Sequence, residues 1–269
     1  MKKHNCILRG STATGLIPLY YRSEESKNIN TSFKDDFAEK AVSKIDFPFN
    51  IFKKDVFIQS VIIYRTVLID QIIKDLLNIE KGHITIVNLG CGFDSRSERL
   101  LIADINWVEI DLPEVIKLKR VLLHENNKRQ YIPASIMEDN WFIDISKKNK
   151  IIIILEGLLY YFKRTEAIWL LNLLSNQFPY ATIIADYCSP FAACISRHRR
   201  KKEIINNTML WGVRSADKIA VLCPKLRLYS TTKILQANQQ LNAYMKLLCQ
   251  HPLISSLYKI AIFETIYKP

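Results

Sequence analysis

Two glycines and two acids stand at the ends of expected strands, where they could hold a charged, nucleoside-containing cofactor. The segment VNLGCGFDSRSERL, residues 87–100, places Gly90 and Gly92 directly after an apolar run. Glycines there allow a tight turn and a close approach of the backbone to a ligand. Further along, WVEID ends in Glu109 and Asp111, which share one strand face. Asp111 lies at the strand end, so its carboxylate can accept hydrogen bonds from both ribose hydroxyls.

The turn lacks the third glycine of a dinucleotide-binding fingerprint, because Ser95 stands in that position. Asp94 adds a negative charge near the expected helix start, and this charge would repel a pyrophosphate. S-adenosylmethionine carries a ribose and an adenine but no phosphate, and its sulfonium and ammonium groups are cations. An acid-bearing glycine turn therefore favours S-adenosylmethionine over NAD as the cofactor.

Alternating strands and helices must position these residues. The hydrophobic patterns predict strands at 83–90, 106–111, 129–135, 150–157 and 180–187, and helices at 32–45, 57–79, 95–103, 113–126 and 165–178. This alternation over about 110 residues predicts an α/β fold with a doubly wound, mostly parallel sheet.

We expect a single domain of 269 residues. Beyond Tyr187 the chain becomes polar, basic and irregular, which is typical of an insertion or lid, and a helix is expected at 232–250. The expected regions are an N-terminal helical cap at 1–80, a cofactor-binding core at 81–189, a lid-like insertion with a helix at 190–250, and closing strands at 251–269.

Composition indicates a soluble cytoplasmic protein. Hydrophobic residues make up 49% and charged residues 24% of the chain. No apolar run is expected to span a membrane, and the N-terminus has no apolar core of a secretory signal. The six cysteines are scattered without metal-like pairs, so we expect reduced thiols and no metal site.

The net charge of +12 raises the question of a nucleic-acid partner. Lysines are spread along the chain, and only SRHRRKK, residues 196–202, forms a cluster. Three interpretations of this cluster stay open: a solvated helix face, an acceptor-binding or lid element, and a nucleic-acid patch.

Several segments resemble the leucine carboxyl methyltransferase family, in particular its bacterial branch of tetracenomycin-type polyketide O-methyltransferases. They occur in the family's order at 11–26, 34–42, 64–73, 87–100, 107–123 and 152–162. The resemblance covers about residues 11–187. It implies a Rossmann-like class I methyltransferase that uses S-adenosylmethionine.

The resemblance also implies roles for individual residues. Arg65 would pair with the methionine carboxylate of the cofactor, and an arginine amid VIIYRTVLI needs such a partner. Gly90 would line the methionine moiety through its backbone, and Asp111 would hold the ribose.

Three further residues complete the expected cofactor site. Glu156 ends an apolar strand, where the cofactor ammonium would give it a partner; the alternative is a cap for the following helix. Ser135 and Ile136 align with the family's Asp-Leu pair near the adenine. Since a serine hydroxyl binds an amino group more weakly than a carboxylate does, this contact departs from the family's pattern.

The acceptor side is less defined. Tyr20, Arg22 and Tyr187 are the candidates for shaping an acceptor pocket, and no catalytic base can be assigned, since His124 and His198 are interpreted as surface histidines. The expected function is O-methylation of a small-molecule carboxylate or hydroxyl in secondary metabolism. Alternatives are carboxyl methylation of a protein or peptide terminus and, less favoured, nucleic-acid methylation. No membrane partner is expected, and the oligomeric state stays open.

Overall fold

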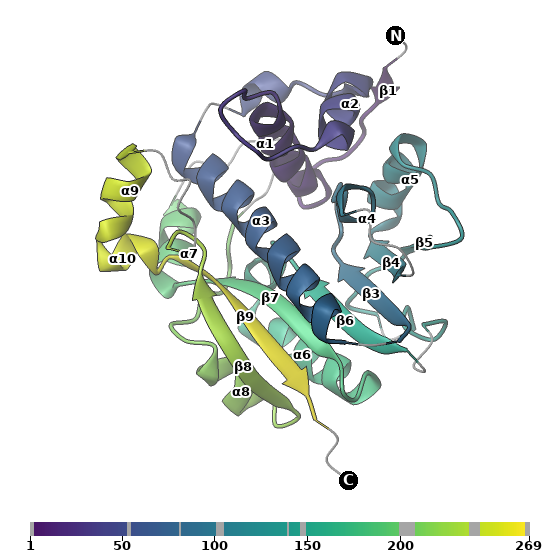
Figure 1. The fold of residues 1–269 in the computed structure, drawn as a ribbon, viewed down its shortest axis with the longest axis vertical. Helices are drawn as coiled ribbons and strands as arrows, with labels where there is room; N and C mark the ends of the chain where they lie inside the picture. The colour runs from purple at the N-terminus through teal and green to yellow at the C-terminus, as the bar shows by residue number, and fades with distance from the viewer. Residues whose placement is uncertain are drawn as a thin grey trace.

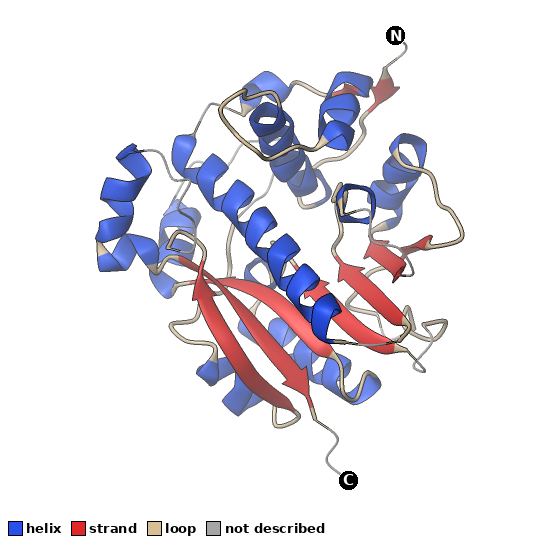
Figure 2. Cartoon of the chain, viewed as in Figure 1, coloured by secondary structure: helices blue, strands red, loops and turns tan. Residues whose placement is uncertain are grey.

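The computed structural model describes residues 3–52, 55–80, 82–100, 105–138, 140–145, 149–198, 208–236 and 243–266. Within these ranges a seven-stranded sheet forms the centre of the fold, with helices on both faces (Figures 1 and 2). Its strands are β3 (Ile84–Leu89), β4 (Ile105–Asp111), β5 (Arg129–Pro133), β6 (Lys150–Leu155), β7 (Thr182–Cys188), β8 (Leu226–Lys233) and β9 (Tyr258–Thr265).

The strand order is β5-β4-β3-β6-β7-β9-β8. The first five are parallel, whereas β9 runs antiparallel to both β7 and β8. Every residue of β3 is buried, because helices cover both faces, and this accounts for its nearly continuous apolar sequence. The doubly wound, mostly parallel sheet predicted above is therefore confirmed.

Ten α-helices are seen among the described residues: α1 (Leu16–Ser26), α2 (Asp36–Lys44), α3 (Val56–Ile79), α4 (Arg96–Arg99), α5 (Pro113–Leu122), α6 (Arg164–Gln177), α7 (Pro190–His198), α8 (Asp217–Leu222), α9 (Ala243–Gln250) and α10 (Pro252–Ser255). Side-chain caps begin two of them, since Asp35 accepts from the Ala38 N–H and Asp55 from the Ile58 N–H. Short 3₁₀ turns lie at Thr12–Gly15, Phe49–Ile51 and Leu159–Tyr161, and β1 (His4–Asn5) pairs with β2 (Ile45–Asp46).

The long helix α3 crosses one face of the sheet (Figure 1). An 18-residue window of this 24-residue helix has a mean hydropathy of 1.6, so by length and composition the helix is sufficient to cross a membrane, which the sequence reasoning above did not anticipate. In the fold, however, Ile69 and Ile73 are fully buried and pack in the same core cluster as residues of β3 and β6. Packing inside the domain accounts for the buried part of this helix, which is 39% of its apolar window.

Beyond β7 the structure corrects the expected pattern. Residues 226–233, expected to be irregular or to begin a helix, form β8. The helix expected at 232–250 is seen only as α9, while residues 237–242 lie outside the described ranges. The helix expected at 95–103 is the short α4, with 101–104 likewise outside them.

Candidate cofactor and acceptor site

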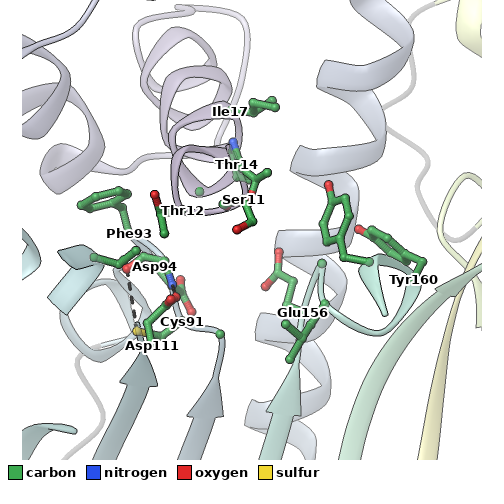
Figure 3. Close-up of a pocket in the computed structure, with 18 of the residues that line it drawn as sticks. Ser11, Thr12, Thr14, Ile17, Cys91, Phe93, Asp94, Asp111, Glu156 and Tyr160 are labelled. Atoms are coloured by element: carbon green, nitrogen blue, oxygen red, sulfur yellow. Dashed lines mark hydrogen bonds between the residues drawn. The ribbon is translucent and has the colours of Figure 1, made fainter. Parts of the chain in front are cut away.

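A cavity of about 480 Å³ opens where the parallel strands end, beneath the N-terminal segment (Figure 3). From β3 the chain continues to β4 and β5 on one side of β3, and then to β6 and β7 on its other side. The direction in which strands are added to the sheet therefore reverses at β3. Ligands of doubly wound folds bind at this kind of position. All six residues expected to bind the cofactor line the cavity: Arg65, Gly90, Asp111, Ser135, Ile136 and Glu156.

The glycine turn after β3 is hydrogen-bonded to the end of β4. Gly90 and Gly92 have φ angles of +62° and +46°, which favour glycine. The Gly92 N–H donates to Asp111 Oδ2 at 2.7 Å, and the Leu112 N–H donates to Oδ1 at 2.7 Å. The pKa of Asp111 is raised, because the effect of burial is larger than that of these two hydrogen bonds, which act to lower it. The Asp111 carboxylate is thus held at the cavity edge.

The second acid of the β4 segment faces elsewhere. Glu109 is buried, forms an ion pair with the fully buried Lys119, and accepts a hydrogen bond from Ser97 Oγ at 2.8 Å. It does not line the cavity. Of the two acids, only Asp111 is placed where it could contact a ribose.

Arg65 on α3 and Glu156 after β6 meet in the cavity wall. Arg65 Nε donates to Glu156 Oε1 at 2.9 Å, and its Nη1 donates to the Tyr160 hydroxyl at 2.8 Å. Asp186 Oδ2 also accepts from Nη1, at 3.0 Å. Burial acts to raise the pKa of Glu156, but Arg96 and Arg65 outweigh it, so the pKa is lowered. The wall therefore presents an ionised carboxylate.

Sequence reasoning missed a buried arginine behind this wall. Arg96 Nη1 lies 2.6 Å from both Asp94 Oδ2 and Glu156 Oε2, and its Nε donates to Asp70 Oδ1 at 2.6 Å. The run of charges in FDSRSER was the available signal, although a short charged segment ordinarily indicates an exposed turn.

The expected adenine side is lined by consecutive residues 134–137, which follow β5. Ser135 Oγ accepts a hydrogen bond from the Met137 N–H at 3.3 Å. The side chain of Ile136 is buried and joins the large core cluster on one face of the sheet. Ser135 and Ile136 both line the cavity.

Of the three candidate acceptor residues, the structure brings only Arg22 to the cavity, and its guanidinium is already used. Arg22 Nε donates to Asp35 Oδ2 at 2.9 Å and Nη2 to the Phe93 carbonyl at 2.6 Å. Tyr20 does not line the cavity; its ring packs against those of Phe49 and Phe52. Arg22 therefore braces the glycine turn.

Tyr187 is likewise displaced from the cavity. Successive residues of a strand point to opposite faces, and on β7 it is Asp186 that contacts Arg65. Tyr187 is buried on the other face, in the cluster that includes Val213 and Ala216. The expectation that Tyr187 shapes the cavity mouth is thus corrected.

Other residues form the rest of the cavity wall, and most are apolar or aromatic. The apolar and aromatic ones include Ile17, Pro18, Ile58, Val61, Ile62, Leu158, Tyr160, Tyr161, Phe162, Met209, Leu210 and Tyr258, and the polar ones are Ser11, Thr12, Thr14, Asn88, Asp94 and Thr208. Burial raises the pKa of Tyr161 to about 12. None of the chain's five histidines, all of which are described, lines the cavity. In the described part of the chain no three His, Cys, Asp or Glu side chains gather as around a metal ion.

The end of α7 braces one wall of the cavity. Ser196 Oγ accepts from the Met209 N–H at 2.9 Å, and Arg197 Nη1 donates to the Leu210 carbonyl at 3.3 Å. These two residues begin the basic cluster 196–202, whose residues from 199 onward lie outside the described ranges. The described part of the cluster thus contacts the segment that lines the cavity.

Comparison with known proteins agrees with this geometry. The chain is 22% identical over 221 residues to the tetracenomycin polyketide synthesis O-methyltransferase TcmP of Streptomyces glaucescens, covering 82% of each chain. It is 28% identical over 193 residues to the S-adenosyl-L-methionine-dependent methyltransferase dpfgK of Gibberella zeae, covering 66% of this chain and 65% of that one.

Solved structures share the fold. A protein of Thermobifida fusca assigned as a methyltransferase superposes with a TM-score of 0.60 at 11% identity, over 93% of this chain and 94% of that one. A DUF574 family protein of Streptomyces avermitilis gives 0.59 at 9% identity, over 92% and 96%. Residues 22–175, more than half of the chain, match the leucine carboxyl methyltransferase family. The chain belongs to this family and is an S-adenosylmethionine-dependent methyltransferase with a class I fold.

Proposed function

We propose that this enzyme methylates an oxygen atom of a small, largely apolar or aromatic acceptor of secondary metabolism, at a carboxylate or a hydroxyl. The observation that carries the proposal is the wall formed by Ile17, Ile58, Tyr161, Phe162 and residues 208–210 beside the strand-end carboxylates. Such a wall suits an aromatic body better than a polar one. The similarity to an O-methyltransferase of polyketide synthesis supports the same acceptor class.

The strand-end residues fit the cofactor. Gly90 has a φ of +62°, which disfavours any other residue, and a Cβ atom there would lie 2.7 Å from Leu158 Cδ1. The Asp111 carboxylate faces the place of a ribose, and Glu156 presents negative charge to an ammonium group. When bound, S-adenosylmethionine supplies a methyl group on a positively charged sulfur, ready for displacement. The chain's own contribution is to orient the two reactants, which can lower the barrier by about 7–11 kcal/mol.

Apart from the carboxylates of Asp94, Asp111 and Glu156, which we propose serve the cofactor, the described cavity wall offers no side chain suited to remove a proton at neutral pH. Tyr161 stays protonated because burial raises its pKa to about 12. The acceptor that fits best is therefore one that arrives ionised: a carboxylate or an acidic phenol. In the transfer, an oxygen lone pair forms the bond to the methyl carbon while the carbon–sulfur bond breaks, and its electrons stay on sulfur.

The test is methyl transfer from labelled S-adenosylmethionine to aromatic carboxylic acids, phenols and short peptides with free C-termini. We expect label in an aromatic acid or an acidic phenol. Mild base then separates the two chemistries, because a methyl ester releases methanol and an aryl methyl ether does not. Transfer to peptides alone would contradict the proposal, and transfer to RNA alone would replace it with the nucleic-acid interpretation.

We also propose that the enzyme works in the cytoplasm. All six cysteines lie within the described ranges and are free thiols. Four of them are buried inside the fold. This thiol content supports a reducing compartment.

A further inference from the structure

Arg96 lies directly behind the part of the cavity wall that we assign to the cationic end of the cofactor. Its side chain is only 1% exposed and does not line the cavity. Asp94 and Glu156, which it contacts, both do. Asp94 belongs to the turn after β3 and Glu156 to the end of β6, so one guanidinium joins two neighbouring strand ends.

The contacts of Arg96 are short and fill most of its hydrogen-bonding positions. Nη1 lies 2.6 Å from one oxygen of Asp94 and 2.6 Å from one oxygen of Glu156. Nε donates to Asp70 at 2.6 Å, and Nη2 donates to the Thr66 carbonyl at 3.4 Å. Two buried carboxylates this close to each other would repel, and an uncompensated buried charge is costly. A shared guanidinium removes that repulsion.

We propose that Arg96 is a positioning residue for cofactor binding: it holds the carboxylates of Asp94 and Glu156 ionised and at a fixed separation, so that they receive the ammonium group of S-adenosylmethionine. The proposal rests on use of this cofactor and does not depend on the acceptor class. It assigns to Arg96 a role in binding that is exerted entirely through its two partners.

Other titratable groups act on the pair or on its arginine partners. Arg22 on α1, Arg65 on α3, Arg99 on α4 and Lys119 on α5 act on Asp94 or Glu156. Asp70 on α3 acts on Arg96, and Tyr160 after β6 and Asp186 on β7 act on Arg65. Burial alone would raise the pKa of Asp94, yet Arg96, followed by Arg99 and Arg22, lowers it. For Glu156 the opposing cations are Arg96 and then Arg65. In both cases Arg96 is the strongest of the cations that keep the group charged.

Arg99 provides a matched control from the same short helix. It forms ion pairs with Asp70 through Nη2 at 2.9 Å and with Asp35 through Nη1 at 3.3 Å. Neither of these carboxylates lines the cavity. Arg96 and Arg99 have the same chemistry, and their side chains are 1% and 11% exposed, but only Arg96 contacts the wall that we assign to the cofactor.

The experiment is calorimetric titration of the folded wild-type protein, Arg96→Gln and Arg99→Gln with S-adenosylhomocysteine, which retains the ammonium group. At about pH 8 we expect Arg96→Gln to bind at least about 10-fold more weakly than wild type and Arg99→Gln within about 3-fold. Lowering the pH to about 6 should weaken Arg96→Gln more than wild type, because burial, which acts to raise the pKa of both carboxyl groups, is less opposed once Arg96 is removed. Asp111 is present in all three proteins, so any contribution from it cancels in the comparison.

The proposal would be overturned if the affinity for S-adenosylhomocysteine changed with pH in the same way in wild type and Arg96→Gln. It would also be overturned if Arg96→Gln and Arg99→Gln lost the same affinity. If Arg96→Gln fails to fold, the comparison passes to Arg96→Lys and Arg99→Lys. The lysine at position 96 keeps one charge but cannot bridge both carboxylates, so affinity should fall at least about 5-fold while the pH dependence stays close to wild type. Equal affinity of the two lysine variants would be the contrary result. Absence of binding by wild type would instead contradict use of the cofactor.

Discussion

Gly15 of the N-terminal segment packs directly on Gly92 of the turn after β3. A Cβ atom on Gly15 would lie 3.3 Å from Gly92 Cα and 3.6 Å from Phe93 Cδ2. Both glycines line the cavity, together with Ser11, Thr12 and Thr14 of the same segment (Figure 3). The first residues of the cap therefore form part of the wall of the cofactor site, in direct contact with its central turn.

Enlarging Gly15 should separate the cap from the turn. Its φ of −62° is open to any residue, so an effect of substitution comes from the contact and not from backbone strain. We expect Gly15→Val to weaken binding of S-adenosylhomocysteine by about 10-fold or more and Gly15→Ala by only a few-fold, since a methyl group requires a shift of a few tenths of an ångström. Calorimetric titration measures both. Equal affinities for all three proteins would show that the contact is not needed.

The two acids of β4 should give separable effects. Asp111→Asn should weaken cofactor binding by about 2–3 kcal/mol while the protein stays folded, because a charge-assisted acceptor is lost at the cavity edge. Glu109→Gln should instead lower the free energy of unfolding by about 3–5 kcal/mol, since it leaves the buried Lys119 ammonium unpaired. Denaturant unfolding and calorimetric titration test the pair. A loss of affinity in Glu109→Gln at unchanged stability would reverse these assignments.

The pH dependence should show no base at the cavity. Because burial raises the pKa of Tyr161 to about 12, its hydroxyl stays protonated throughout the usual assay range. With a carboxylate acceptor, kcat/KM should vary little between about pH 6 and pH 9; with a phenol it should rise until the phenol itself is ionised. Tyr161→Phe should leave the shape of either profile unchanged. A profile with a pKa that disappears in Tyr161→Phe would identify this tyrosine as the missing base.

Residues at the end of α7 should affect the acceptor and not the cofactor. Ser196→Ala and Arg197→Gln each remove a hydrogen bond to residues 208–210, so the acceptor's KM should rise by about 3–10-fold at unchanged affinity for S-adenosylhomocysteine. Arg227→Gln on β8 is the charge-matched control, because Arg227 pairs with the exposed Glu264 away from the cavity.

The same variants examine the remaining interpretations of the basic cluster. Unchanged KM values would favour a solvated helix face. Binding of RNA by wild type, with a steep salt dependence that is reduced in Arg197→Gln, would indicate a nucleic-acid patch.

The convergence of Gly90, Asp111 and Glu156 could be predicted because it follows from topology. Parallel strands end at the same edge of a sheet, and each of these residues closes or follows a strong apolar strand. Burial on both faces made β3, β6 and β7 easy to recognise from the sequence. The alternating, half-exposed pattern of β8 carried a weaker signal, and this strand was missed.

Side-chain direction explains the two misplaced tyrosines. Tyr20 and Arg22 are two positions apart on α1, about 200° around the helix, so the two cannot both face the cavity. Tyr187 adjoins Asp186 on β7, and a strand places such neighbours on opposite faces. The family resemblance and the strand-end position suggested these residues, while the period of the helix or strand decides which side chain reaches the cavity.

The buried arginines could not be placed from the sequence. Arg96 belongs to a four-residue helix in a run of charges, and only the packing of α3 against the turn removes it from solvent. Its partners Asp70 and Glu156 are far away in the chain. A network of this kind becomes visible only when the tertiary structure is known.

The position of β9 between β7 and β8 has a consequence for synthesis (Figure 1). As the chain leaves the ribosome, the strands from β3 to β7 can pair with one another in turn. The next strand, β8, emerges before β9, and β9 is the one neighbour of β8 among the described strands. The backbone N–H and C=O groups of β8 therefore stay unpaired until residues up to 265 have been made. Unpaired strands of this kind are open to wrong pairing. The outer part of the sheet therefore stays unfinished until the residues of β9 are free to pair.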